Sequence, residues 1–276
     1  MASFVVTDST AYLPADILQR YGVKVVPLNV SLAGEVFKEG LVYSNAQYYQ
    51  RLRTEKIFPS TSQPATGDFY QAFSQAAPGD TVICITISGE LSGTVHSAQV
   101  AREMLPERNI VIVDSRSTVM GLGFQVIRAC EMLAAGVGAE SIVAELQYIR
   151  EHVSLFFIVD DLEYLVRGGR LTRVGQFLGN ILQIKPILQV ESGVIKVYDK
   201  VRTKHKALER ILEDFAARNA GQAVQQVCVL HVDAREEALR LKERVAGFFA
   251  GPVMMSEAGP VIGSHVGPGA LGLCYY

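Results

Sequence analysis

Hydroxyl-bearing residues and glycines gather at a few points in the first half of the sequence. Thr61-Ser62-Gln63-Pro64 is expected in a loop before a helix, and Leu91-Ser92-Gly93-Thr94 follows a predicted strand and opens another helix. Hydroxyls and free N–H groups at a helix start favour a carboxylate or a phosphate. Asp8-Ser9-Thr10 also follows a predicted strand. Capping and turn formation could explain each group alone, but their recurrence on one rim indicates an anion site.

A histidine near the end of the sequence stands in an unusual setting. His265 lies within the glycine- and proline-rich segment Gly259–Gly272. Because glycines allow close backbone approach and prolines stiffen the chain, we expect a rigid loop that holds this imidazole in a site. The other histidines lack such a setting and are expected to be structural or on the surface: His96, His152, His205 and His231.

No complete catalytic motif accompanies these residues. Ser92 precedes His96 by one helical turn, but the sequence has no G-x-S-x-G elbow and no evident acid to orient an imidazole. The phosphate-binding motif GxxxxGK[ST] is absent, and Gly121-Leu122-Gly123 does not complete GxGxxG. The remaining combination of hydroxyls, glycines and one histidine among many apolar residues suits an amphipathic ligand with a small anionic head.

Alternating strands and helices should position these residues. Short apolar runs predict strands at Phe4–Thr7, Lys24–Leu28, Thr81–Ile85 and Asn109–Val113. Helices are predicted at Pro14–Tyr21, Asn45–Thr54, Gly67–Ala76, Leu91–Leu105 and Met120–Ala135. This succession indicates an α/β fold with a mainly parallel sheet, whose carboxyl edge is the usual place for a ligand.

The second half has a different texture. Strands are predicted at Leu155–Val159, Ile184–Val190, Val194–Tyr198, Val227–Val232 and Val253–Ser256, with helices at Lys204–Asn219 and Arg235–Phe248. The Glu191-Ser192-Gly193 step between two of the strands signals a hairpin, so a mixed α/β sheet is expected here. We therefore predict two domains, residues 1–152 and 153–276.

Composition excludes several classes of protein. The 276 residues are 49% hydrophobic and 20% charged, which fits folded domains rather than disorder. A net charge of −2 argues against nucleic-acid binding by the whole chain, although residues 161–210 carry ten Lys/Arg against five Asp/Glu. The four cysteines have no metal-ligand spacing and are expected to be reduced core thiols. The start lacks a basic segment before its short apolar run, so a cytoplasmic location is expected.

A series of short motifs, in this order, resembles the DegV family of bacterial fatty-acid-binding proteins. The motifs are Thr7-Asp8-Ser9-Thr10-Ala11, Leu13-Pro14, Pro27-Leu28-Asn29-Val30, Thr61-Ser62-Gln63-Pro64, Leu91-Ser92-Gly93-Thr94, Asp114-Ser115, Leu162-Glu163-Tyr164-Leu165, Gly168-Gly169-Arg170, Lys185-Pro186-Ile187-Leu188, Arg202-Thr203 and His265-Val266-Gly267-Pro268-Gly269. The resemblance covers essentially the whole chain. It implies a two-domain α/β protein that buries a long-chain fatty acid in a tunnel.

The resemblance also implies a set of head-group contacts. Thr61 and Ser92 would hydrogen-bond the carboxylate, and His265 would lie near it. The neighbouring residues of the same site would be Ser62, Gly93 and Thr94. No cofactor and no metal are implied, and the fatty acid is the only ligand.

A protein partner is implied as well. Family members present the fatty acid to a separate ATP-dependent fatty acid kinase, which forms the acyl phosphate used for phospholipid synthesis. Arg170 and Arg202 would contact the kinase, and a transient contact with a membrane surface is compatible with this role. Two departures stand out, since the family often has Ser-Ser where this chain has Ser88-Gly89, and Asp-Gly where it has Glu39-Gly40.

Two other functions stay open on sequence grounds. One is an acyl-ester hydrolase with Ser92 as nucleophile and His265 as base. The other is a lipid sensor that binds the same ligand but has no kinase partner.

Overall fold

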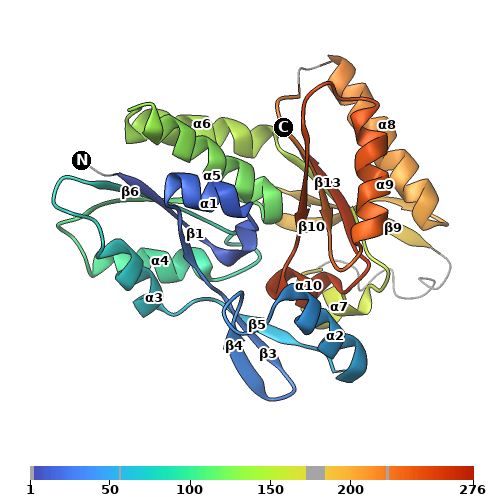
Figure 1. Ribbon diagram of the computed structural model, residues 1–276, viewed down its shortest axis with the longest axis horizontal. Helices are drawn as coiled ribbons and strands as arrows, with labels where there is room; N and C mark the ends of the chain where they lie inside the picture. The colour runs from blue at the N-terminus through green and yellow to red at the C-terminus, as the bar shows by residue number, and fades with distance from the viewer. Residues whose placement is uncertain (1–2, 56, 172–183, 222–223) are drawn as a thin grey trace.

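The computed structural model describes residues 3–55, 57–171, 184–221 and 224–276. In this part of the chain the strands form three sheets, two of them large (Figure 1). Arg173, one of the ten Lys/Arg residues of the segment 161–210, lies outside the described residues.

The N-terminal sheet is parallel throughout, in the order β2-β1-β6-β7. Its strands are β1 (Phe4–Asp8), β2 (Lys24–Val26), β6 (Thr81–Thr86) and β7 (Asn109–Asp114). The inner strands are almost wholly buried, because helices cover both faces. On one face lie α1 (Ala15–Tyr21) and α5 (Val119–Ala134), with α6 (Ala139–His152) packed on α5, and on the other lie α3 (Thr66–Phe73) and α4 (Thr94–Glu103) (Figure 1).

Two glycines let α5 sit close to the sheet's edge. A Cβ at Gly121 would lie within 2.0 Å of the hydroxyl of Ser117, and one at Gly123 would lie 3.1 Å from the carbonyl of Ala11, in the short 3-10 helix η1 (Ser9–Ala11). The Gly121-Leu122-Gly123 sequence thus serves helix packing.

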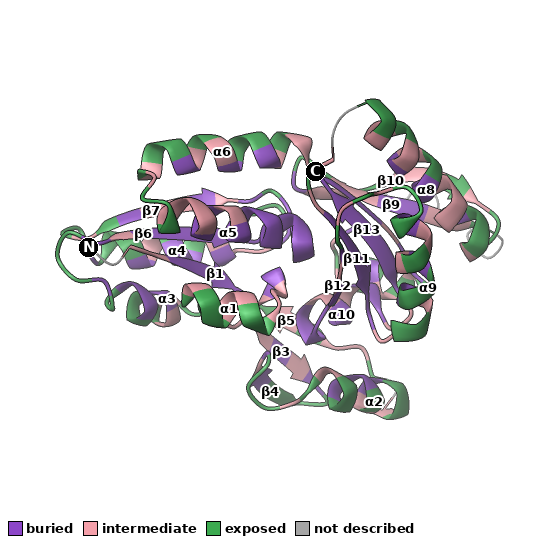
Figure 2. Ribbon diagram, turned by 45° about the horizontal axis from the view of Figure 1, so that its top comes forward, coloured by how far each residue is buried: buried purple, intermediate pink, exposed green. Residues whose placement is uncertain are grey.

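The C-terminal sheet is mixed, in the order β10-β9-β8-β13-β11-β12. Its strands are β8 (Ser154–Ile158), β9 (Lys185–Glu191), β10 (Val194–Val201), β11 (Val227–His231), β12 (Val253–Glu257) and β13 (Leu271–Tyr275). Only the β11–β12 pair of this sheet is parallel within the described residues. The long helices α8 (Lys204–Gly221) and α9 (Arg235–Ala246) cover one face, while the other faces the N-terminal half (Figure 2).

A small third sheet was not predicted. It has the order β4-β3-β5 and consists of β3 (Asn29–Leu32), β4 (Glu35–Lys38) and β5 (Ser60–Ser62). With α2 (Asn45–Glu55) it packs against the late helix α10 (Pro260–Val266), which also contacts α7 (Glu163–Arg167). Residues from the first and last quarters of the chain therefore share one apolar cluster.

The predicted fold class is confirmed: a parallel N-terminal sheet and a mixed C-terminal sheet. The predicted hairpin is also present, with Ser192 and Gly193 at positive φ between β9 and β10. The predicted division into domains 1–152 and 153–276 falls between the end of α6 and the start of β8, and it stays a prediction.

Two local predictions are wrong. Thr61 and Ser62 lie in strand β5 rather than in a loop, because β3 supplies a hydrogen-bonding partner. His265 lies in helix α10 rather than in a loop, because Pro260 occupies the helix start and Gly267 ends it at positive φ.

The cysteines are confirmed as buried and unpaired. Among the described residues there is no group of three or more His, Cys, Asp or Glu side chains that could hold a metal ion. Within the same ranges, none of the helices combines the length and the apolar character needed to cross a membrane.

Candidate functional site

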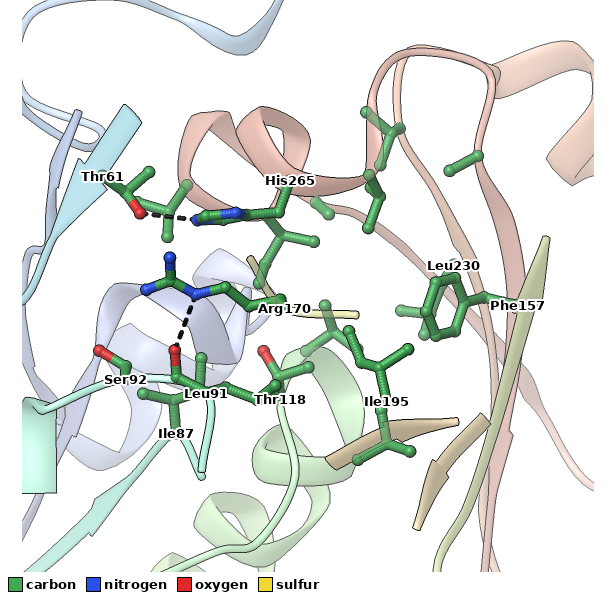
Figure 3. A pocket seen from close by; sticks show the side chains of 18 of the residues that line it. Thr61, Ile87, Leu91, Ser92, Thr118, Phe157, Arg170, Ile195, Leu230 and His265 are labelled. Atoms are coloured by element: carbon green, nitrogen blue, oxygen red, sulfur yellow. Dashed lines mark hydrogen bonds between the residues drawn. The ribbon is translucent and has the colours of Figure 1, made fainter. Parts of the chain in front are cut away.

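A cavity of about 350 Å³ lies between the carboxyl edge of the N-terminal sheet and the inner face of the C-terminal sheet. This volume falls in the range of small-molecule sites. Most of its wall is apolar, with side chains that come from both halves of the chain, including Ile87, Leu91, Val119, Phe157, Ile195 and Leu230 (Figure 3). The cavity therefore offers a hydrocarbon surface that neither half could form alone.

Polar side chains gather at one end of this cavity. Thr61 on β5, Ser92 before α4, Arg170 after α7 and His265 on α10 lie there, opposite the apolar end near Leu230 (Figure 3). Four segments that are distant in the sequence thus meet around one small polar region. An amphipathic ligand would find donors at this end and hydrocarbon contacts along the rest.

The His265 imidazole is held as a neutral group. Its Nε2 lies 2.7 Å from the Oγ1 of Thr61. Burial, with a further contribution from the positive charge of Arg170, lowers the pKa of His265 from 6.5 to about 4. Its Nδ1 is buried and has no hydrogen-bond partner among the described residues. At neutral pH the ring therefore contributes a polar contact and no charge.

Arg170 supplies a positive charge at the same end. Its Nε donates to the carbonyl of Leu91 over 3.1 Å, and its Nη1 donates to the carbonyl of Gly168 over 2.7 Å. These contacts fix the guanidinium, but in the described part of the chain no carboxylate forms an ion pair with it. Burial alone lowers the pKa of Arg170, which nevertheless stays charged.

The Ser92-Gly93-Thr94 turn forms another side of the polar end. The Ser92 hydroxyl lies 2.8 Å from that of Thr94, and Ser92 and Gly93 line the cavity. Thr94 is fully buried and does not line the cavity, so its contact with the site is through the hydroxyl of Ser92. Gly93 lies directly against the side-chain amide of Gln63, which would have to move if residue 93 carried a Cβ.

Of the other residues singled out from the sequence, Ser62 lines the cavity, whereas Arg202 and Asp8 do not. Ser62 lines the cavity from β5. Arg202 is exposed in the bend between β10 and α8 and does not line the cavity. Asp8 is buried and structural, since it accepts hydrogen bonds from the backbone N–H groups of Thr10 and Ile87.

Sequence reasoning missed other polar residues of the wall. Gln63 lines the cavity and belongs to the motif Thr61-Ser62-Gln63-Pro64, but it was not predicted as a site residue. The side-chain amide of Gln63 donates a hydrogen bond to the hydroxyl of Ser97 over 3.1 Å. Thr118, with a buried hydroxyl that has no partner in the described ranges, directly follows the polar residues after β7. His231 lines the wall at the end of β11, where nothing in the sequence distinguished it from a structural histidine.

A family model described as "Uncharacterised protein, DegV family" matches residues 3–276. The chain belongs to the DegV family. This DegV protein is similar to the fatty-acid-binding DegV family protein of Thermus thermophilus, with 36% identity, a TM-score of 0.93, and coverage of 100% of this chain and 99% of that chain. It is also similar to DegV of Bacillus subtilis, a fatty acid binding protein, with 33% identity and a TM-score of 0.92. That match covers 99% of this chain and 98% of the Bacillus subtilis chain.

A third similar structure names the ligand more narrowly. It is a stearic acid-binding protein of Eubacterium ventriosum, with 26% identity, a TM-score of 0.91, and coverage of 99% of this chain and 97% of that chain. Because each of the three matches covers 99% or more of this chain, the similarity spans all three sheets.

The geometry of this DegV protein does not favour the hydrolase alternative. The imidazole of His265 faces Thr61, and the hydroxyl of Ser92 faces Thr94. His96 is exposed on α4. In the described residues no histidine hydrogen-bonds Ser92, so a nucleophile activated by a base is not assembled.

Proposed function

We propose that this DegV protein binds a long-chain fatty acid, with the acyl chain in the apolar part of the cavity and the carboxylate at its polar end. The observation that carries the proposal is Arg170, a half-buried cation without a carboxylate partner in the described residues, at one end of an otherwise apolar cavity. A fatty acid supplies both the missing anion and the hydrocarbon. The ligands named for the similar structures support this assignment.

The energetics suit tight retention of such a ligand. Burying each methylene contributes roughly 0.8 kcal/mol, so about 14 methylenes offer on the order of 11 kcal/mol before ordering costs. The carboxylate must then be satisfied, because burying it unpaired is costly. Thr61, Ser92 and His265 provide hydrogen-bonding groups, and Arg170 adds a charge-assisted contact.

We also propose that the protein presents its fatty acid to a separate fatty acid kinase and performs no chemistry of its own. Arg170 supports this proposal because it also lines an outer hollow with Glu90, Gly169 and Val194, so one side chain borders both the cavity and the surface. The exposed Arg202 would contribute a second contact. A cytoplasmic location and a transient membrane-surface contact for delivery of the product are parts of the same proposal.

The decisive experiment is identification of whatever co-purifies with the protein. Mass spectrometry of the denatured protein should find long-chain fatty acid, and delipidated protein should bind palmitate or oleate. Lipid-free protein that also fails to bind either acid would overturn the proposal. Pull-down with the host's fatty acid kinase tests the partner separately, and binding of lipid without a kinase complex would instead favour the sensor.

A further inference from the structure

Helix α10 carries His265, yet its own residues do not cap its start. The residue before the helix is Gly259, which has no side chain, and Pro260 at the first position has no N–H group. The next two N–H groups, those of Val261 and Ile262, precede the first intrahelical bond, which Gly263 donates to Gly259 over 2.9 Å. These groups need acceptors from elsewhere in the fold.

Both acceptors come from the N-terminal half of the chain. The Oε1 of Glu39, directly after β4, accepts the N–H of Val261 over 2.7 Å. The hydroxyl of Tyr12 accepts the N–H of Ile262 over 3.2 Å and itself donates to Glu39 Oε1 over 2.8 Å. A Cβ at Gly259 would lie 2.8 Å from that carboxylate oxygen, so the glycine makes the approach possible.

Glu39 is itself rigidly placed. It is 6% exposed, and its backbone N–H donates to the carbonyl of Leu28 over 2.9 Å. Burial raises its pKa to about 7, and the nearby Asp8 acts in the same direction. Besides Asp8, the titratable groups around this carboxylate include Tyr12 and Tyr49, which lie on the N-terminal side of α10. A buried carboxyl group on a fixed strand end can act as an anchor for the helix.

We infer that Glu39 is a positioning residue of the head-group site, which, through its hydrogen bond to Val261, holds α10 so that His265 meets Thr61. Val261 and His265 are one helical turn apart and both line the cavity. A shift at the start of α10 therefore moves the imidazole away from Thr61. This inference extends the proposed function, since the affinity for a carboxylate would depend on a residue that does not touch it.

Two readouts test the inference on delipidated full-length protein. The dissociation constant for palmitate is measured by titration calorimetry, and the pKa of His265 is measured by NMR titration without ligand. Glu39→Ala should weaken palmitate binding about fivefold to tenfold, as expected for loss of a helix cap. It should also raise the pKa of His265 from about 4 toward 6.5, because the imidazole leaves its buried place. Glu39→Gln, which keeps the length and an acceptor oxygen, should restore both values to near wild type.

Controls separate positioning from general stability. Glu35→Ala removes an exposed carboxylate of the same small sheet, and Phe215→Leu weakens the core under α8, so neither should change the readouts. Wild-type values for Glu39→Ala, or equal changes in Phe215→Leu, would overturn the inference. If Glu39→Ala does not fold, Glu39→Asp, whose shorter side chain draws the carboxylate back from the N–H of Val261, should move both readouts in the same direction, and its failure to do so would also overturn the inference. Because the pKa measurement needs no ligand, it tests the inference even if wild-type protein binds no fatty acid.

Discussion

Replacing Arg170 by methionine should distinguish its role from that of Arg202, although the resemblance assigned both arginines to the contact with the kinase. Methionine keeps much of the apolar stem but removes the guanidinium, which borders the cavity beside His265. Arg202→Met is the matched control, because Arg202 is exposed and does not line the cavity. We expect the first change to weaken fatty acid binding and the second to leave it unchanged.

The magnitude follows from the contact that is lost. A hydrogen bond to a charged group contributes about 1.5 to 3 kcal/mol, and each 1.4 kcal/mol is tenfold in affinity. Because Arg170 is only about half buried, water screens part of its charge, so the lower end applies. The dissociation constant for palmitate should therefore rise about tenfold.

A neutral ligand makes the experiment sharper. Hexadecanol has the same hydrocarbon chain without the carboxylate, so its affinity should be equal in wild type and Arg170→Met. The pKa of His265 should also rise in this variant, since the charge of Arg170 helps to lower it. Equal palmitate affinity in wild type and Arg170→Met, or an equal loss for palmitate and hexadecanol, would refute the counter-charge argument.

Three further predictions concern the head group, the tail and the buried carboxyl group. Ser92→Ala should weaken palmitate binding by about 1.5 to 3 kcal/mol in calorimetry, while Ser74→Ala, which removes an exposed hydroxyl on α3's carboxyl end, should not; equal affinities would contradict the role of Ser92. Leu230→Trp at the apolar end should shift the retained ligands toward shorter acyl chains by mass spectrometry, and an unchanged profile would mean that the tail does not reach Leu230. Burial raises the pKa of Glu39 from its ordinary value of 4.5 to about 7, so the folded protein favours the protonated carboxyl group. The contribution of Glu39 to the free energy of unfolding therefore falls by about 3 kcal/mol as the pH rises from 4.5 through 7. Urea unfolding of delipidated Glu39→Gln should therefore show a gain over wild type at pH 8 that shrinks at pH 5, and a pH-independent difference would argue against the buried charge.

The sequence predicts the large-scale fold because its strongest signals are local. Uninterrupted apolar runs such as Thr81–Ile85 are typical of strands buried on both faces, and β6 is buried on both faces. The short strand β5 carries only serine and threonine, so no periodicity marks it, and it exists because β3 pairs with it. A signal for α10 was available, since a proline at the start and a glycine after the end are characteristic of a helix.

The candidate site is less accessible from sequence because four distant segments assemble it. The hydroxyls of Thr61 and Ser92 could be proposed from their motifs, and the structure brings them to one end of a cavity. Whether Arg170 faces the surface or the cavity depends on how α7 packs against α10, which no local pattern encodes. The anchoring contact of Glu39 joins residues 222 positions apart and has no sequence signature.

The order of strands in the C-terminal sheet constrains when the ligand chamber can be completed during synthesis. Strand β13, the furthest along the sequence, lies in the interior of the sheet, with β8 on one side and β11 on the other. A nascent chain that has not yet reached Leu271 therefore has two unconnected sheet fragments, and the part of the cavity wall formed by Leu271 and Gly272 is missing. Lipid capture must therefore wait until β13 has been synthesised, and a product truncated before this strand would expose two unpaired strand edges instead of a closed chamber.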